Sequence, residues 1–126
     1  MKHIFFIAIG GAFGAVGRFL ATEFVQRKVA IGFPIGTLTV NVVGCFLIGL
    51  LLQFENQSQW LTSSHRTLLV TGFLGAFTTF STFGHDTVRY AQASLPLAVL
   101  NIGTNVILGI AAVAFGIICA RILGPS

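Results

Sequence analysis

The residues best suited to chemistry lie in a short hydroxyl-rich stretch, from Thr78 to Phe83, in the second half of the chain. Four hydroxyl side chains stand there with two phenylalanines inside an otherwise apolar run. Hydroxyls donate and accept hydrogen bonds, and the edge of a phenyl ring carries partial positive charge, so together they suit a small anion. The alternative is that Phe80 and Phe83, like most of the 13 phenylalanines, contact lipid or core. The interleaved Ser81 and Thr82 favour the anion.

Three asparagines and one arginine add polar groups to other apolar runs. Asn41 lies near the middle of one run, while Asn101 and Asn105 are four apart on another, with Thr104 between them. An amide in a membrane span either ties helices together or donates to an ion, and both interpretations stay open here. Arg18, near the end of the first run, either serves function or extends to the lipid headgroups.

The composition requires that these polar groups sit in a membrane protein. The chain has 126 residues, of which 8% are charged and 55% hydrophobic, and its mean hydropathy is +0.92. Soluble domains carry about 25% charged residues, so an ordinary soluble enzyme, a disordered tail and a disulfide scaffold are excluded. The basic residues stand mostly singly at the edges of apolar runs, which argues against nucleic acid despite the net charge of +4.

Four apolar runs are long enough to cross a bilayer, which takes roughly 20 residues per helix. They are residues 4–24, 34–54, 67–84 or slightly beyond, and 96–120. We therefore predict a single all-α transmembrane domain over residues 1–126. The connectors, among them 85–90, hold most of the charges and the interfacial aromatics Trp60 and Tyr90. Small residues four apart predict close helix packing at three pairs, Gly10 with Gly14, Gly32 with Gly36, and Gly72 with Ala76.

The third run has features of a broken helix. Gly72 and Gly75 weaken it, and the hydroxyl residues that follow compete for backbone groups. We predict a break near residues 75–79. Non-helical backbone at membrane depth persists only where it is buried in protein or lines water, and the freed carbonyls of such breaks hold small cations in transporters. The alternative is a continuous helix whose hydroxyls bond to carbonyls four residues back.

The charges that flank the runs give almost no signal for orientation. With four spans, the basic residues divide evenly, with Lys2, Arg66 and Arg121 on one side and Arg27, Lys28 and Arg89 on the other. Because orientation follows the side richer in Lys and Arg, this balance predicts insertion both ways up. The alternative is a small protein of ordinary topology with a weak bias.

Three stretches carry a resemblance to a known family: residues 10–19, 36–44 and 72–83. With the length and the four spans, they closely resemble the bacterial fluoride channels, the Fluc or CrcB family, over essentially the whole chain. The third stretch is the most specific. The resemblance implies an antiparallel, dual-topology homodimer in the bacterial cytoplasmic (inner) membrane, with two pathways that conduct fluoride passively and lower cytoplasmic fluoride.

The same resemblance implies roles for individual residues. The fluoride pathway would be lined by Phe80, Phe83, Asn41, Ser81 and Thr82, with Arg18 near its aqueous entrance. The backbone carbonyls of Gly75 and Thr78 would bind a central sodium ion shared by both subunits. The fourth span departs from the family, because Ile102 and Val106 are apolar where an aromatic or hydroxyl track is common. Which of the polar residues beside them faces the pathway is left open: Asn101, Thr104 or Asn105.

The main competing function is a small dual-topology multidrug or cation transporter. That class couples to protons through a glutamate within its first span, whereas here the first span holds Arg18 and Glu23 lies at its edge. A structural subunit of a larger complex would explain the glycines but not the cluster of residues 78–83. An enzyme is not indicated, because His85 and Asp86 are accompanied by no nucleophile and no metal-ligand cluster, and we interpret them as a pair at a helix end.

Overall fold

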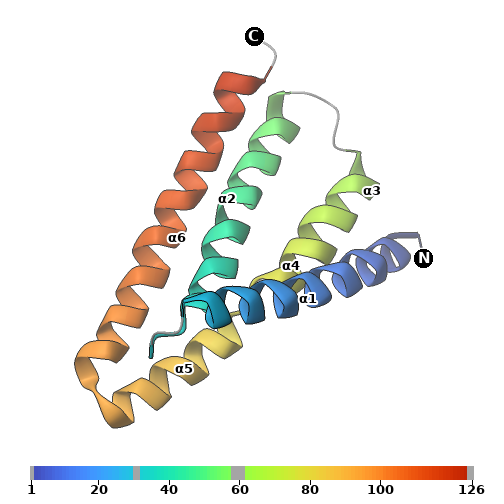
Figure 1. The fold of residues 1–126 in the computed structure, drawn as a ribbon. Helices are drawn as coiled ribbons and strands as arrows, with labels where there is room; N and C mark the ends of the chain where they lie inside the picture. The colour runs from blue at the N-terminus through green and yellow to red at the C-terminus, as the bar shows by residue number, and fades with distance from the viewer. Residues whose placement is uncertain (1, 30–31, 58–61, 125–126) are drawn as a thin grey trace.

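A computed structural model describes residues 2–29, 32–57 and 62–124, and the regular structure in those residues is helical throughout (Figure 1). The elements in chain order are α1 (Lys2–Lys28), α2 (Ile35–Gln57), α3 (Ser63–Arg66), the π-helix η1 (Thr67–Leu74), α4 (Gly75–Phe77), α5 (Phe80–Ala93) and α6 (Leu95–Leu123). Four helical segments are long and apolar enough to cross a membrane: Lys2–Lys28, Ile35–Gln57, Ser63–Ala93 and Leu95–Leu123. The prediction of an all-α protein with four spans is confirmed.

The third span extends further than predicted. The sequence predicts a connector at residues 85–90, but α5 continues through it and ends at Ala93, where Ser94 takes an extended conformation. Charged residues fit a helix when they lie on its polar face, and the helix breakers, Ser94 and Pro96, come only later. Tyr90 therefore lies in α5 and not in a connector. Trp60 lies outside the described residues.

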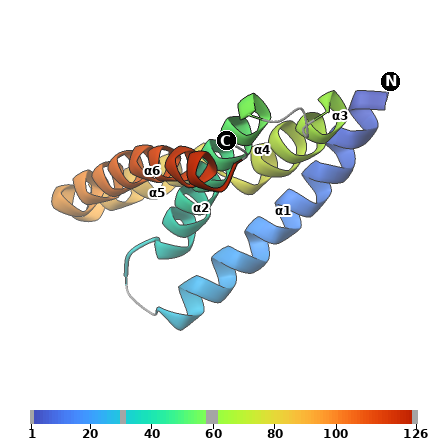
Figure 2. The ribbon, with the colours of Figure 1, turned by 90° about the horizontal axis from the view of Figure 1, so that it is seen from above.

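Glycines allow α1 to cross the first half of the third span in close contact (Figures 1 and 2). A Cβ atom on Gly10 would overlap the Leu68 carbonyl oxygen, and one on Gly14 would overlap that of Phe73. A Cβ on Gly72 would lie 3.0 Å from the Cα of Gly10. Two of the predicted close-packing sites are thereby confirmed, because η1 meets α1 backbone to backbone.

The same device joins α2 to its neighbours. α2 and α6 lie side by side, and Cβ atoms on Gly49 and Gly116 would overlap backbone carbonyls across that contact (Figure 1). Gly36 packs against α1, because a Cβ atom added to it would lie 2.6 Å from the Thr22 carbonyl oxygen. Gly32 has open space around it. The predicted close packing is therefore confirmed at Gly36 and wrong at Gly32. Seen from above, α5 and α6 lie on one side of α2 and α1 on the other (Figure 2).

The interior of the single chain is small, and its surface is apolar. The buried apolar side chains are few: Leu38, Val40, Leu74, Phe77, Ala98 and Ala120. Large apolar side chains such as Phe13 and Ile110 are more than half exposed. A surface of this kind belongs in lipid or against another protein chain. Three of the spans, α2, the third span and α6, meet at a polar region beside the interruption of the third span.

Candidate functional site

The third span is interrupted at two residues. Thr78 has φ −83° and ψ 155°, and Thr79 has φ −146° and ψ 110°, both extended. The sequence predicts a break within residues 75–79, and in the structure the break lies at Thr78 and Thr79, the C-terminal end of that range. In a continuous helix the Thr79 N–H would bond to the carbonyl of Gly75. Here it donates to Asn41 Oδ1 of α2 at 2.8 Å. Gly75, which is exposed, keeps a carbonyl released from that helical bond.

The hydroxyl residues around the break have different partners. Thr78 Oγ1 donates to the Leu74 carbonyl at 3.1 Å, the local bond that a hydroxyl in a helix commonly makes. Thr79 caps α5: its Oγ1 accepts from the Thr82 N–H at 3.2 Å. The same oxygen lies 3.0 Å from Thr82 Oγ1 and 3.3 Å from Ser81 Oγ. The side chains of Ser81 and Thr82 are exposed next to this cap.

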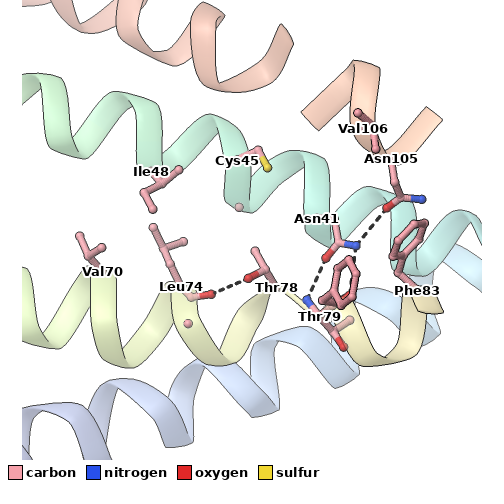
Figure 3. Close-up of a pocket in the computed structure, with 13 residues that line it drawn as sticks. Asn41, Cys45, Ile48, Val70, Leu74, Thr78, Thr79, Phe83, Asn105 and Val106 are labelled. Atoms are coloured by element: carbon pink, nitrogen blue, oxygen red, sulfur yellow. Dashed lines mark hydrogen bonds between the residues drawn. The ribbon is translucent and has the colours of Figure 1, made fainter. Parts of the chain in front are cut away.

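A cavity of about 380 Å³ opens beside the break (Figure 3). It brings together five of the residues that the sequence singles out, from α2, α4, the break and α5: Asn41, Gly75, Thr78, Phe80 and Phe83. The rest of its lining is mainly apolar: Gly44, Cys45, Ile48, Val70, Leu74, Thr79, Asn105 and Val106. A mostly apolar cavity with a few convergent polar groups is typical of a site for a small ligand. Ser81, Thr82 and Arg18 lie outside this lining.

Phe80 and Phe83 form a pair of rings at the edge of the cavity. Their centroids are 5.4 Å apart and the ring planes meet at 56°, because residues three apart share a helix face. Phe80 is 82% exposed, although it lies beside a polar site, while Phe83 is half-buried. In the described chain, the Phe83 ring thus packs against the protein, and the Phe80 ring lies at the open side of the cavity.

Asn41 ties helices together and also lines the cavity. It ties α2 to the third span, because its Nδ2 donates to the Thr79 carbonyl at 3.2 Å and its Oδ1 accepts from the Thr79 N–H. Its second Nδ2 hydrogen bond goes to Asn105 Oδ1 of α6 at 3.0 Å. It also lines the cavity. Thr79 is 6% exposed, and its N–H is thus satisfied by a side chain in place of a helical carbonyl.

The fourth span contributes Asn105 and Val106 to the cavity lining. Of the three polar residues that the sequence leaves open, Asn105 lines the cavity, whereas Asn101 and Thr104 lie outside the lining. Asn101 is fully buried and donates through Nδ2 to Thr87 Oγ1 of α5 at 2.9 Å. Thr104 donates to the Leu100 carbonyl of its own helix at 2.8 Å. Sequence reasoning missed Thr87; its spacing of four residues from Phe83 was the available signal, since that spacing places both on one helix face.

A second polar cluster lies around Asp86, midway along α5. This residue is 9% exposed, and its carboxylate accepts a hydrogen bond from Thr37 Oγ1 at 3.3 Å and lies 3.6 Å from Arg89 Nη2. His85 Nδ1 is 3.7 Å away. The sequence suggests that His85 and Asp86 belong to a helix end, and this is wrong, because α5 continues for seven residues beyond Asp86.

Arg18 lies on α1, half-buried and away from the cavity lining. Glu23, the one acidic residue near it on α1, pairs instead with Arg27 at 2.8 Å. In the described part of the chain no salt bridge involves Arg18. Its guanidinium is therefore available to an anion or to lipid headgroups.

Comparison with known proteins places this architecture in one family. The family described as CrcB-like protein, Camphor Resistance (CrcB), matches residues 5–117. The chain belongs to this family. Its relatives include proteins named fluoride-specific ion channel FluC in three bacteria. The relative from Acidobacterium capsulatum is 42% identical over 94% of both chains. That from Nitratiruptor sp. is 47% identical over 91% of this chain and 89% of its own, and that from Vibrio parahaemolyticus is 50% identical over 88% of both.

Proposed function

We propose that this CrcB-family chain is a fluoride channel that conducts fluoride passively across the bacterial cytoplasmic (inner) membrane and lowers cytoplasmic fluoride. The observation that carries the proposal is the meeting of Asn41, Phe80 and Phe83 in one cavity at the helix break. The relatives named as fluoride-specific channels support the choice of ion. On this proposal the chain is not an enzyme.

The chemistry of the cavity suits a small, strongly hydrated anion. Such an ion enters a membrane only if protein donors replace its water. In the cavity, the Asn41 NH2 group and the ring edges of Phe80 and Phe83 supply positive potential without a fixed charge, and outside its lining the exposed hydroxyls of Ser81 and Thr82 add further donors. An ion of either sign that binds too tightly does not conduct, so weak donors in series favour passage.

Asn41 can donate to the ion without losing its place. Its NH2 group already donates to two neutral oxygens, at 3.2 Å and 3.0 Å. A fluoride ion that replaces the Asn105 oxygen as acceptor forms a charge-assisted hydrogen bond, which is roughly twice as strong as a neutral one. The Asn41 Oδ1 bond to Thr79 holds the side chain during the exchange. Half-buried Arg18 attracts the anion toward the aqueous entrance of the pathway.

The proposal includes an antiparallel, dual-topology homodimer with two pathways. It is supported by the evenly divided flanking charges and by the exposure of Phe80 beside the cavity. A phenyl ring that is 82% exposed next to a polar site is poorly placed for lipid alone, and a second copy would cover it. Each pathway would then be lined by residues of both copies.

A sodium ion at the centre of this dimer is also part of the proposal, with the backbone carbonyls of Gly75 and Thr78 as its ligands. The residues fit such an ion, because the Thr79 N–H bonds to Asn41 and so releases the Gly75 carbonyl, and because Gly75 is exposed. Broken helices in transporters hold sodium in the same way. When bound, the ion would supply a fixed positive charge shared by the two copies. Gly75 and Thr78 would orient their carbonyls toward it.

The function is tested by ion release from liposomes that contain the purified protein. Vesicles loaded with potassium fluoride or potassium chloride receive valinomycin, so that potassium leaves with any permeant anion. We expect rapid fluoride release, chloride retention, and no release from protein-free vesicles. Equal release of both halides would overturn fluoride selectivity. Uptake of a cationic dye driven by a proton gradient, with no fluoride release, would indicate the transporter alternative.

A further inference from the structure

A chain of hydrogen bonds runs from the cavity into the interior between α5 and α6. At its inner end, Thr87 Oγ1 donates its one hydrogen to the Phe83 carbonyl at 2.8 Å. The same oxygen accepts from Asn101 Nδ2 at 2.9 Å. Asn101 is fully buried, and with Val40 it is among the largest side chains that the fold encloses completely. A hydroxyl with its hydrogen already committed can only accept, so Thr87 fixes which end of the Asn101 amide faces it.

The direction set by Thr87 passes along three amides. Asn101 Oδ1 accepts from Asn105 Nδ2 at 3.1 Å, and Asn105 Oδ1 accepts from Asn41 Nδ2 at 3.0 Å. Asn41 Oδ1 then accepts from the Thr79 N–H at 2.8 Å. The two ends of the chain are backbone groups that cannot exchange roles: a carbonyl at Phe83 and an N–H at Thr79. Rotation of any one amide by 180° would set two donors or two acceptors against each other.

We propose that Thr87 and Asn101 are positioning residues for conduction, which hold the Asn41 amide with its NH2 group on the cavity side. In Figure 3 the Asn41 nitrogen lies toward Asn105 and Phe83, and its oxygen lies toward Thr79. Neither Thr87 nor Asn101 belongs to the cavity lining. Because the chain ends on the Phe83 carbonyl, it also ties the turn that carries one of the two rings to the amide that donates to the ion. This inference rests on the proposed fluoride pathway.

Loss of the Thr87 hydroxyl would remove this control. The fully buried Asn101 NH2 would have no acceptor there, and a buried polar group without a partner costs about 1–3 kcal/mol. Rotation of Asn101 and Asn105 relieves that cost, since an apolar group at position 87 no longer distinguishes the two ends of Asn101, but it sets the Asn105 NH2 group against the Asn41 NH2 group. Asn41 would then be divided between its present orientation, which the Thr79 N–H still favours, and one with its oxygen on the cavity side. An oxygen repels an anion where the NH2 group attracts it.

The test compares Thr87→Val with two matched variants. Thr87→Ser keeps the hydroxyl. Thr104→Val removes a hydroxyl from the adjacent helix, where it bonds only to backbone carbonyls of α6. We expect Thr87→Val to lower fluoride flux per assembled protein about tenfold, the equivalent of one net hydrogen bond. The Thr87→Ser and Thr104→Val proteins should stay within about twofold of the unchanged protein, a difference far smaller than one hydrogen bond.

A spectroscopic readout separates positioning from general loss of structure. In protein labelled with 15N-asparagine, the side-chain amide signal of Asn41 is assigned by its loss in Asn41→Ser. We expect Thr87→Val to shift or double this signal and to abolish its response to potassium fluoride, while Thr104→Val leaves both unchanged. If Thr87→Val does not assemble, Thr87→Cys, with its weak S–H donor, is measured in the same way.

Two results would overturn the inference: an Asn41 signal that Thr87→Val leaves in place, or a flux that it lowers no more than Thr104→Val does. Failure of the proposed function is distinct from either. It would appear as absence of fluoride flux in the unchanged protein, whereas the orientation of Asn41 is still reported by its amide signal.

Discussion

The side chain of Asn41 binds both backbone polar groups of Thr79, the N–H at 2.8 Å and the carbonyl at 3.2 Å. Asn41, 38 positions away, thereby supplies the acceptor that the Gly75 carbonyl would give to the Thr79 N–H in a continuous helix. The break is tolerated because α2 supplies an amide that satisfies the backbone of Thr79. The same contact places an NH2 group beside two phenylalanine rings, in the cavity where we propose that fluoride passes.

Replacement of Asn41 by aspartate separates its two roles. An aspartate keeps an oxygen for the Thr79 N–H but loses the NH2 group and brings a negative charge to the cavity. Because like charges repel at close range, we expect fluoride efflux to fall at least tenfold while the protein still assembles. Asn56→Asp, an exposed change further along α2, is the control and should leave efflux unchanged. Normal efflux in Asn41→Asp would remove Asn41 from the pathway.

The glycine contact between α1 and η1 gives a prediction about stability. A methyl group at Gly10 would overlap the Leu68 carbonyl, and neither helix backbone can move aside without loss of packing. Gly10→Ala should therefore lower the free energy of unfolding by about 1–3 kcal/mol. The thermal midpoint of the detergent-solubilised protein should fall accordingly. Gly103→Ala, in open space on α6, should keep or raise the midpoint. Equal midpoints for the two variants would show that the α1–η1 contact contributes little.

The balanced flanking charges give a prediction about topology. Two lysines added at the N-terminus should force one orientation, because the side richer in positive charge stays in the cytoplasm. Fluoride efflux should then fall, and co-expression with a copy biased the other way should restore it. Full activity of the biased form alone would contradict the antiparallel dimer.

Sodium dependence tests the carbonyl ligands at Gly75 and Thr78. A ligand that binds only the assembled protein stabilises it by an amount that grows with its concentration. At constant ionic strength, exchange of sodium chloride for N-methylglucamine chloride should lower the thermal midpoint of the assembled protein. An unchanged midpoint across the exchange would argue against a bound sodium ion.

Hydropathy and local propensity predict much of this fold. The four spans follow from apolar runs, and the break follows from Gly75 and the threonines after it. The end of the third span is mispredicted because hydropathy treats Asp86 and Arg89 as connector residues, although a helix buries the aspartate against Thr37 of α2. Charge in a helix is tolerated where another helix supplies a partner, and such a partner is not visible in a local pattern.

The cavity is predicted only in part, for a similar reason. The residue types at Asn41, Phe80 and Phe83 indicate an anion site, but which asparagine of the fourth span faces it depends on how α6 is rotated against α2. That rotation is set by backbone contacts at Gly49 and Gly116, far from the site in sequence. The direction of the amide chain depends on Thr87, a residue with no distinguishing pattern of its own.

The proposed pathway places the ion against the edges of two phenyl rings, and fluoride flux per assembled protein in Phe80→Ile and Phe83→Ile tests this placement. Isoleucine keeps the apolar character but removes the positive ring edge, whereas methionine keeps a flexible, polarizable side chain. We expect both isoleucine proteins to assemble and to lose most of their flux, with the methionine variants less affected. Flux per assembled protein that stays at the unchanged level in the isoleucine variants would contradict the account.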